Sequence, residues 1–215
     1  MAKLPPIGSK HKICVICEGE EDFAYFTRLT ELAVWDRTYE FKQVNAKSAS
    51  NIPAAYENYY QNNSYEAILV FCDTDKFPYR EYALIKQKIS DFHGENNTAL
   101  GKIIIFANPC TMQIILSHFG EVSLVNQGKK TNADIIEKLT GVSNYDAHSD
   151  QIKAICSKIF HRTYSDMRER VAAINNPDTV SGSTNFIEFL PKFESTDTAW
   201  IQELKDCLTK DGQDA

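Results

Sequence analysis

The sequence predicts an α/β fold with a doubly wound parallel sheet flanked by helices and a helical C-terminal extension. Three observations support this prediction. Short, almost wholly apolar runs recur at 12–17, 67–72 and 102–107, and such runs suit strands that are covered on both faces. Segments with apolar residues at helical spacing separate these runs, which indicates βαβ units. After Gly120 the strand-like runs stop and helical patterns follow.

The expected elements alternate in chain order. Three acidic residues, Glu20, Glu21 and Asp22, favour a helix start directly after the first strand. Pro53 and Pro78 stand near the start of two further helices, where a missing N–H costs nothing. We expect strand 12–17, helix 20–34, strand 39–44, helix 53–61, strand 67–72, helix 78–92, a polar loop at 93–101, strand 102–107 and helix 110–119.

The C-terminal part is expected to contain helices and no strands. We predict an α/β domain over 12–120 and a helical extension over 121–215. The extension either packs on the sheet or covers it, and its sequence does not decide between the two. Its expected elements are helices 132–139, 148–160, 163–174 and 196–208, with a polar loop at 175–185.

The composition narrows the class of protein. The chain has 215 residues, of which 43% are hydrophobic and 24% charged, as in ordinary globular domains. No apolar run reaches the roughly 20 residues that cross a bilayer, and the N-terminal stretch lacks the apolar segment of a signal peptide. We therefore expect a cytoplasmic protein without membrane contact. A net charge of −6 argues against a protein that binds nucleic acid through phosphate contacts alone, but it is compatible with acidic metal ligands.

The six cysteines are expected to be mostly buried free thiols. Cys14 and Cys17 form a C-x-x-C pattern, but in a strand their side chains would point to opposite faces. No second pair completes a zinc site in the sequence. We therefore do not expect a zinc or redox site at this pair.

Acidic residues follow two of the predicted strands. Glu18 closes 12–17, and Asp73 and Asp75 close 67–72. Ligands of open parallel sheets bind beyond the carboxyl ends of the strands, so neighbouring strands would bring these carboxylates together. A divalent cation would relieve their repulsion, and oxygen ligands without a histidine cluster suit Mg²⁺ or Mn²⁺. The alternative is a strand end at which the Asp side chains bond their own backbone.

Several nearby residues are candidates for supporting roles. Gly19 would let the chain turn and let a phosphate approach the backbone, and Asp22 would support the site through the helix start. Lys76 would contact a phosphate or stay solvated. Asn108 would contact the ligand or only shape the turn before Pro109. Packing or surface roles, rather than ligand binding, are expected of the histidines His118, His148 and His161.

Basic residues cluster in and between the two predicted helices 148–160 and 163–174. If they share a face near the acidic edge, a phosphate backbone would rest on it. The alternative is a solvated helix face. The candidates for nucleic-acid contacts are Lys153, Lys158, Arg162, Arg168 and Arg170.

The order of the acidic motifs resembles the Toprim domain of topoisomerases, primases, recombination proteins and OLD-type nucleases. Glu18-Gly19-x-x-Asp22 after a first strand and Asp73-x-Asp75 after a later one match its motifs within residues 12–107. The stretch FANPCTMQIILSHF is similar to the Asn-Pro-Cys segment and following helix of RloB-like Toprim proteins, which are associated with bacterial restriction and phage-defence loci.

The chain departs from this family pattern in two places. Glu20 and Glu21 add acid where many relatives carry Lys or Thr. The segment Thr-Met-Gln-Ile at 111–114 stands where relatives usually show an aromatic and an acidic residue. The second departure leaves one metal ligand or substrate contact of the family without a counterpart.

The resemblance implies a Toprim-like Rossmannoid sheet and a Mg²⁺- or Mn²⁺-dependent nuclease that cleaves DNA or RNA in bacterial anti-phage defence. Glu18, Asp73 and Asp75 would be its catalytic residues and metal ligands, with Glu18 as a further ligand or as general base. The implied partners are nucleic acid and an ATPase or another defence-system protein, and a homo-oligomer is compatible with the sequence. The alternative is a non-catalytic Toprim-like module that binds a nucleotide or a partner protein.

Overall fold

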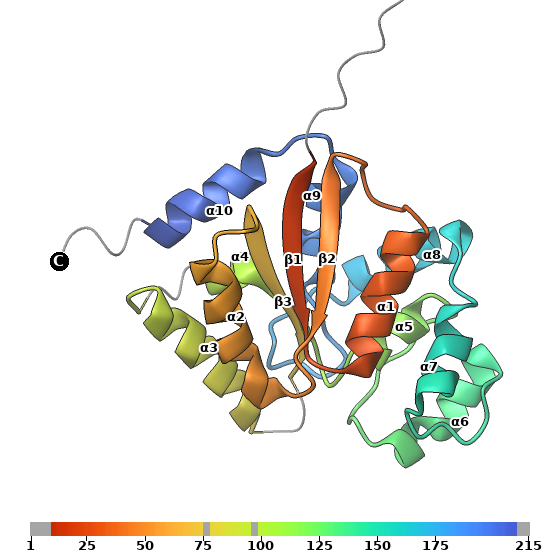
Figure 1. Cartoon of the computed structure of the whole chain (residues 1–215). Helices are drawn as coiled ribbons and strands as arrows, with labels where there is room; N and C mark the ends of the chain where they lie inside the picture. Colours follow the sequence, from red (N-terminus) through yellow and green to blue (C-terminus); the bar gives the residue numbers. More distant parts are fainter. Residues whose placement is uncertain (1–9, 75–77, 96–98, 210–215) are drawn as a thin grey trace, which may run out of the picture.

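The described residues form a four-stranded parallel sheet with helices on its flanks (Figure 1). This computed structural model describes residues 10–74, 78–95 and 99–209. The strand order is β2-β1-β3-β4, and every neighbouring pair is parallel, so the predicted fold class is confirmed. The strands are β1 (His11–Cys17), β2 (Tyr39–Asn45), β3 (Ala67–Asp73) and β4 (Ile104–Ala107).

Helices follow the strands as the sequence predicts, with differences near β4 and at 186–194, where the structure has a 3₁₀ turn and a short helix that were not predicted. A short helix occupies the start of the strand that was predicted from residue 102, because an apolar run alone does not separate a buried strand from a helix. The helices of the described residues are α1 (Glu20–Glu31), α2 (Ile52–Gln61), α3 (Arg80–Phe92), α4 (Leu100–Ile103), α5 (Met112–Ser117), α6 (Lys129–Thr140), α7 (Ser149–Cys156), α8 (His161–Ala173), α9 (Leu190–Glu194) and α10 (Ala199–Thr209), with 3₁₀ turns η1 (Ala49–Asn51) and η2 (Phe186–Glu188).

The chain reverses its direction across the sheet between β1 and β3. It runs from β1 outward to β2, returns to β3 on the other side of β1, and continues to β4. The register pairs Cys17 with Phe71, and the Glu18 N–H extends this ladder to the Phe71 carbonyl oxygen at 3.1 Å. Open α/β sheets bind ligands at such a switch point, beyond the carboxyl ends of the strands. Glu18 and Asp73 therefore lie where this class of fold places its ligands.

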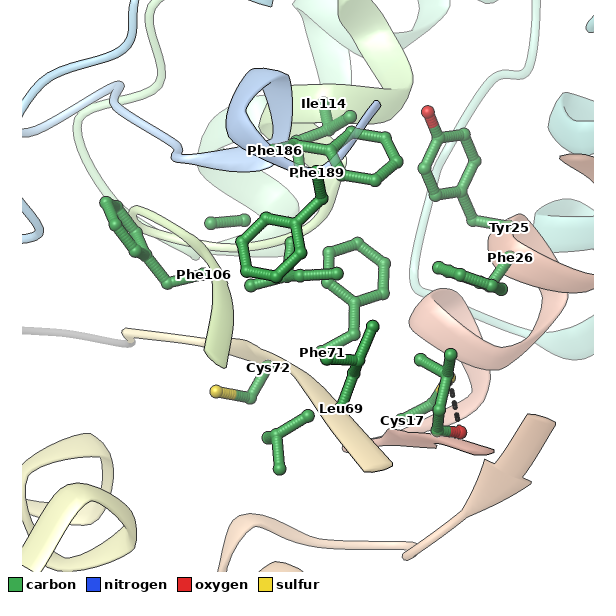
Figure 2. Close-up of a cluster of buried hydrophobic side chains, with 14 of the residues drawn as sticks. Cys17, Tyr25, Phe26, Leu69, Phe71, Cys72, Phe106, Ile114, Phe186 and Phe189 are labelled. Atoms are coloured by element: carbon green, nitrogen blue, oxygen red, sulfur yellow. Dashed lines mark hydrogen bonds between the residues drawn. The ribbon is translucent and has the colours of Figure 1, made fainter. Parts of the chain in front are cut away.

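The central strand β3 is covered on both faces. Every residue from Ala67 to Cys72 is buried, and successive side chains of a strand point to opposite faces. On one face, Phe71 contacts Tyr25 and Phe26 of α1 and stacks on Phe186 with ring centroids 5.8 Å apart (Figure 2). Helix α2 contacts β1 and β3, and α3 packs on α2. The strand ends that carry the acidic residues thus rest on a close-packed core.

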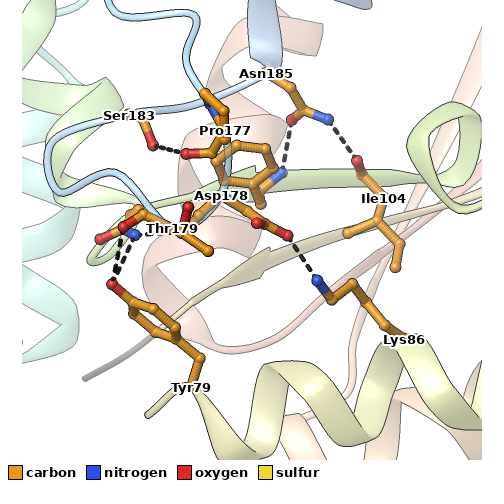
Figure 3. A network of polar contacts seen from close by, with 10 residues as sticks. Tyr79, Lys86, Ile104, Pro177, Asp178, Thr179, Ser183 and Asn185 are labelled. Atoms are coloured by element: carbon orange, nitrogen blue, oxygen red, sulfur yellow. Dashed lines mark hydrogen bonds and ion pairs between the residues drawn. The ribbon is translucent and has the colours of Figure 1, made fainter. Parts of the chain in front are cut away.

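The residues after 120 contribute to the same core as the sheet. Asn185 Oδ1 accepts the Phe106 N–H at 2.9 Å, and Asn185 Nδ2 donates to the Ile104 carbonyl oxygen at 2.8 Å, which completes the hydrogen bonding of β4 (Figure 3). In the same network, Lys86 of α3 donates to Asp178 at 2.7 Å. The η2 and α9 segments supply buried aromatic side chains to the core. The domain boundary after residue 120 stays a prediction.

The described helices and thiols bear on two further predictions. Within the described ranges, no helix is both long and apolar enough to cross a membrane.

Burial raises the pKa of Cys14 to about 12 and that of Cys17 well above its ordinary value, which disfavours the thiolate that metal binding or redox chemistry needs. The free thiols are Cys14, Cys17, Cys72, Cys110 and Cys156, all buried as predicted, and the half-buried Cys207.

Candidate active site

Glu18 and Asp73 lie side by side at the ends of β1 and β3. The Asp73 N–H donates to Glu18 Oε2 at 3.1 Å, which directs the Glu18 side chain across to the neighbouring strand. Asp73 Oδ1 accepts the N–H of Thr111, just before α5, at 2.7 Å. The predicted convergence of these two acids is therefore confirmed. The third predicted acid, Asp75, and the predicted phosphate contact Lys76 lie outside the described residues.

Thr111 joins Asp73 to Asp22. The Thr111 hydroxyl oxygen lies 3.0 Å from Asp73 Oδ1 and also forms a hydrogen bond with Asp22 Oδ1. A hydroxyl donates a single proton, so it cannot serve two ionised carboxylates at once, and the geometry fits a pair in which one carboxyl carries a proton. Asp22 Oδ2 accepts the Gly19 N–H at 2.9 Å. Asp22 thus supports the site through the helix start, as predicted.

The pKa values of the two aspartates agree with a shared proton. Burial raises the pKa of Asp22 to about 7, although the hydrogen bonds that its carboxylate accepts act to lower this pKa. Burial also raises the pKa of Asp73 well above its ordinary value, and the nearby charges of Asp22 and Glu18 raise it further. Crowded carboxyls with raised pKa values are typical of functional sites.

The acidic strand ends form one wall of a cavity of about 460 Å³. The opposite wall comes from the residues after 120. Lys129, Asn132 and Ile136 project from α6 at positions i, i+3 and i+7, which share one helix face. The volume lies within the range of about 300–1,000 Å³ that small-ligand sites occupy. The residues that line the cavity are Glu18, Gly19, Glu20, Glu21, Asp22, Asp73, Cys110, Met112, Gln127, Lys129, Asn132, Ile136, Tyr145, Ala147 and Ile152.

The Tyr145 hydroxyl and the Lys129 charge act on Glu21 from the opposite wall of this acidic cavity. The Tyr145 hydroxyl donates to Glu21 Oε1 at 2.6 Å. Burial raises the pKa of Glu21, while the Tyr145 hydrogen bond and the Lys129 charge lower it. Lys129 itself is exposed in the first turn of α6. The C-terminal part therefore does both things that the sequence left open: η2 and α9 pack on the sheet, and α6 and Tyr145 cover its acidic edge.

The carboxylates suit a hard divalent cation that the substrate helps to bind. Asp73 Oδ1 is occupied by Thr111, and no hydrogen bond within the described ranges uses Asp73 Oδ2. Among the described residues, no three acidic, histidine or cysteine side chains are grouped closely enough to hold a metal ion by themselves. Mg²⁺ commonly binds one or two carboxylates and completes its shell with water and substrate phosphates. Glu18 and Asp73 fit that pattern.

The structure bears on the predicted roles of Gly19 and Asn108. Gly19 has φ −143° and ψ −163°, an extended conformation that any residue adopts, so the predicted need for glycine in the turn is wrong. The buried Asn108 donates through Nδ2 to the Asp178 carbonyl oxygen at 2.7 Å and through its N–H to the Ser183 carbonyl oxygen at 2.9 Å. Asn108 therefore ties the end of β4 to the 175–185 loop and does not line the acidic cavity.

Two of the predicted nucleic-acid contacts are engaged with neighbouring helices. Arg168 pairs with Glu194 of α9 at 3.1 Å, and Arg170 donates to the Ser117 carbonyl oxygen of α5 at 2.6 Å. Positions two apart on a helix point about 200° apart, so one face cannot carry both side chains. The prediction of a single basic face is therefore wrong.

The other three basic candidates have separate surroundings. Lys158 Nζ donates to the Thr140 carbonyl oxygen, and Arg162 is exposed in the first turn of α8. Lys153 is exposed on α7 and lines a second cavity, between α1 and α7. This second cavity shares residues with the acidic one, so Lys153 remains a candidate for a substrate contact.

His118 belongs to the core. Its Nε2 lies 2.9 Å from the Tyr25 hydroxyl, and its Nδ1 lies 3.3 Å from the Thr163 hydroxyl. Burial lowers the pKa of His118 to about 3, so the ring is neutral at physiological pH. The predicted packing role is confirmed. His148 and His161 are exposed.

No protein-family model, curated protein or solved structure matches this chain. The likeness to Toprim proteins therefore rests on the motifs and on their place in the sheet. Glu18 follows β1, Asp22 lies in the first turn of α1, and Asp73 ends β3, in the order of the family motif. Membership of the RloB-like Toprim group stays a prediction.

Three residues of the site were not singled out from the sequence. Thr111 lies in the segment that lacks the acidic residue of the family, and its hydroxyl contacts both Asp22 and Asp73 instead. That departure was the signal that could have identified it. Tyr145 lies 124 positions after its partner Glu21, and Lys129 only begins a helix, so no local pattern marks either of them.

Gly19→Ala should leave the fold unchanged and hinder only the approach of a ligand to the Gly19 backbone. An added Cβ would meet nothing nearer than Asp22 Oδ2 at 3.9 Å, so we expect an unchanged melting temperature. The family resemblance implies a phosphodiester-cleaving activity, and if its substrate approaches the Gly19 backbone, the methyl group should lower the cleavage rate by about tenfold, equivalent to about 1.4 kcal/mol. Melting curves and cleavage rates of parent and variant check this. A stable, fully active variant would show that substrate does not approach this backbone.

Proposed function

We propose that this chain is a Mg²⁺- or Mn²⁺-dependent nuclease of Toprim type that cleaves phosphodiester bonds of DNA or RNA. One observation carries the proposal: Glu18, Asp22 and Asp73 meet at the switch point of a parallel sheet, in a cavity that α6 and α7 close from the other side. Ligands of this fold class bind at that point. Crowded carboxylates that are removed from water favour a bound cation.

The residues of the site support distinct roles. Glu18 and Asp73 would hold the metal, and Asp75 would be a further ligand by its place in the motif. When bound, the metal supplies an activated water and stabilises charge on the phosphate oxygens. Thr111 fixes the orientation of Asp73 through its N–H and hydroxyl. Tyr145, in the wall opposite the acidic strand ends, fixes the orientation of Glu21 through its hydroxyl.

The direct test is a cleavage assay on the full chain. Labelled DNA and RNA oligonucleotides are incubated with Mg²⁺, with Mn²⁺, or with a chelator. We expect cleavage in the two metal arms and none with the chelator. Absence of cleavage in all arms, or cleavage that the chelator does not affect, would count against a metal-dependent nuclease.

A non-catalytic module that binds a nucleotide or a partner protein is the second candidate function. It is favoured by the hydrogen-bonded Asp22–Thr111–Asp73 arrangement, which needs no cation to be satisfied. Nucleotide binding that is unaffected by metal ions, together with no cleavage, is the result that this candidate predicts.

The cellular setting is part of the proposal and rests on the resemblance alone. RloB-like proteins are associated with restriction and phage-defence loci, so we propose a cytoplasmic role in anti-phage defence. An ATPase or another defence-system protein is the proposed partner, and a homo-oligomer is compatible with it.

A further inference from the structure

A second cavity continues the acidic cavity along α1. It has a volume of about 450 Å³ and lies between α1 and α7, which contact one another. Glu20 and Ile152 line both cavities, so the two spaces adjoin. The remaining lining residues of this α1–α7 groove are Phe23, Ala24, Thr27, Arg28, Glu31, Ser149, Lys153, Cys156 and Ser157.

The α1–α7 groove combines the group types that bind single strands of nucleic acid. Lys153 is exposed, and no hydrogen bond or ion pair within the described ranges occupies it. Phe23 is half-buried and lines the groove. The Thr27 hydroxyl oxygen is buried and has no hydrogen-bond partner among the described residues. Grooves for single strands pair cationic groups, which follow the phosphates, with aromatic side chains, on which the bases stack.

The size of the two cavities favours one strand over two. Each has the volume of a site for one small ligand, and each is bounded by elements of this chain. The acidic cavity is closed on its far side by α6 and by the Tyr145–Glu21 hydrogen bond of 2.6 Å. A volume of this order matches one small ligand such as a single nucleotide and is smaller than a base-paired segment of duplex needs.

We propose that the two cavities form one path for a single strand of DNA or RNA, with the reacting phosphate in the acidic cavity and the adjacent nucleotide between α1 and α7. Phe23 stacks on the base of that nucleotide, and Lys153 contacts its phosphate. The substrate class is thus a single strand, a frayed end or an unpaired loop. This inference rests on the proposed function for the position of the reacting phosphate, but its binding test does not.

The test measures binding without cleavage. Fluorescence anisotropy, with Ca²⁺ in place of Mg²⁺, compares one sequence as single-stranded DNA, single-stranded RNA and duplex DNA. We expect a single strand to bind at least about tenfold more tightly than the duplex, since only unpaired bases are free to stack on an aromatic side chain. The two single-strand arms distinguish DNA from RNA. Equal or tighter binding of the duplex, or no binding of either single strand, would overturn the inference.

Two variants of the α1–α7 groove test whether the strand lies between these helices. Lys153→Ala should weaken binding of a single strand and reduce the slope of log affinity against log salt by about 0.7. Phe23→Leu should weaken binding by about tenfold or more without removing charge. Lys88→Ala, which removes an exposed lysine from α3, is the control for charge and should bind like the parent. If both groove variants bind like Lys88→Ala, the strand does not lie between α1 and α7.

A cleavage assay with Mn²⁺ distinguishes a failure of the nuclease proposal from a failure of the single-strand path. Tight single-strand binding without any cleavage would sustain the substrate class and contradict the nuclease. Cleavage of duplex DNA at the rate of the single strand would sustain the nuclease and contradict the single-strand path.

Discussion

Asp73→Asn is expected to abolish phosphodiester cleavage and to leave the fold intact. The loss should be about a thousandfold or more, equivalent to about 4 kcal/mol of transition-state stabilisation. Asn removes the carboxylate charge that would hold the metal. It keeps an Oδ1 that can accept the Thr111 N–H, which Asp73 accepts at 2.7 Å. Cleavage rates and melting curves of parent and variant are the measurements.

The same substitution should raise the stability of the metal-free protein. Burial and the neighbouring acids raise the pKa of Asp73 well above its ordinary value of 3.8, so the folded state holds this proton more tightly than the unfolded state does. The stabilising effect of the proton is complete below about pH 4 and is lost as the pH rises through the folded-state pKa. The gain from Asn should therefore be negligible near pH 4 and largest in alkaline solution.

The matched control is Asp134→Asn, which removes an exposed carboxylate from α6. It should leave both activity and melting temperature unchanged. An Asp73→Asn variant that unfolds would identify Asp73 as a structural residue. One that folds and still cleaves at the parental rate would place the chemistry elsewhere.

Mn²⁺ is expected to raise the melting temperature, and to do so more strongly at higher pH. A ligand of the native state at about 100 times its Kd stabilises that state by about 2.7 kcal/mol, which is roughly 5–10 °C for a chain of this size. The cation binds the ionised carboxylates, and burial raises the pKa of Asp73 well above its ordinary value and that of Asp22 to about 7. The shift should thus be small near pH 5 and full near pH 8.

Thermal unfolding with and without Mn²⁺ at both pH values checks this prediction. Asp73→Asn should lose the shift, and Asp134→Asn should keep it. Melting curves that millimolar Mn²⁺ leaves unchanged near pH 8 would favour the non-catalytic module. A shift that persists in Asp73→Asn would locate the cation at other residues.

The sheet and the acidic pair could be predicted because they depend on local pattern and on general topology. The run 67–72 is apolar at every position and is buried at every position. Glu18 and Asp73 could be placed at the carboxyl ends of their strands from sequence alone. That the two strands are neighbours followed only from the observed order β2-β1-β3-β4, and this adjacency brings the two carboxylates together.

The opposite wall of the site could not be predicted, because it depends on contacts between distant parts of the chain. Tyr145 reaches Glu21 across 124 positions. The basic cluster was misjudged for a related reason: closeness in sequence does not give a shared surface. Arg168 and Arg170 are two positions apart and contact α9 and α5, respectively, while Lys153 lines the second cavity, between α1 and α7.

Anomalous diffraction from a crystal of this chain soaked in Mn²⁺ tests the central claim most directly. The claim is that the acidic edge at the switch point of the sheet binds a divalent cation. We expect an anomalous peak within bonding distance of the carboxylate oxygens of Glu18 and Asp73. A well-ordered site that shows no such peak, with the Asp22–Thr111–Asp73 hydrogen bonds unchanged, would contradict it.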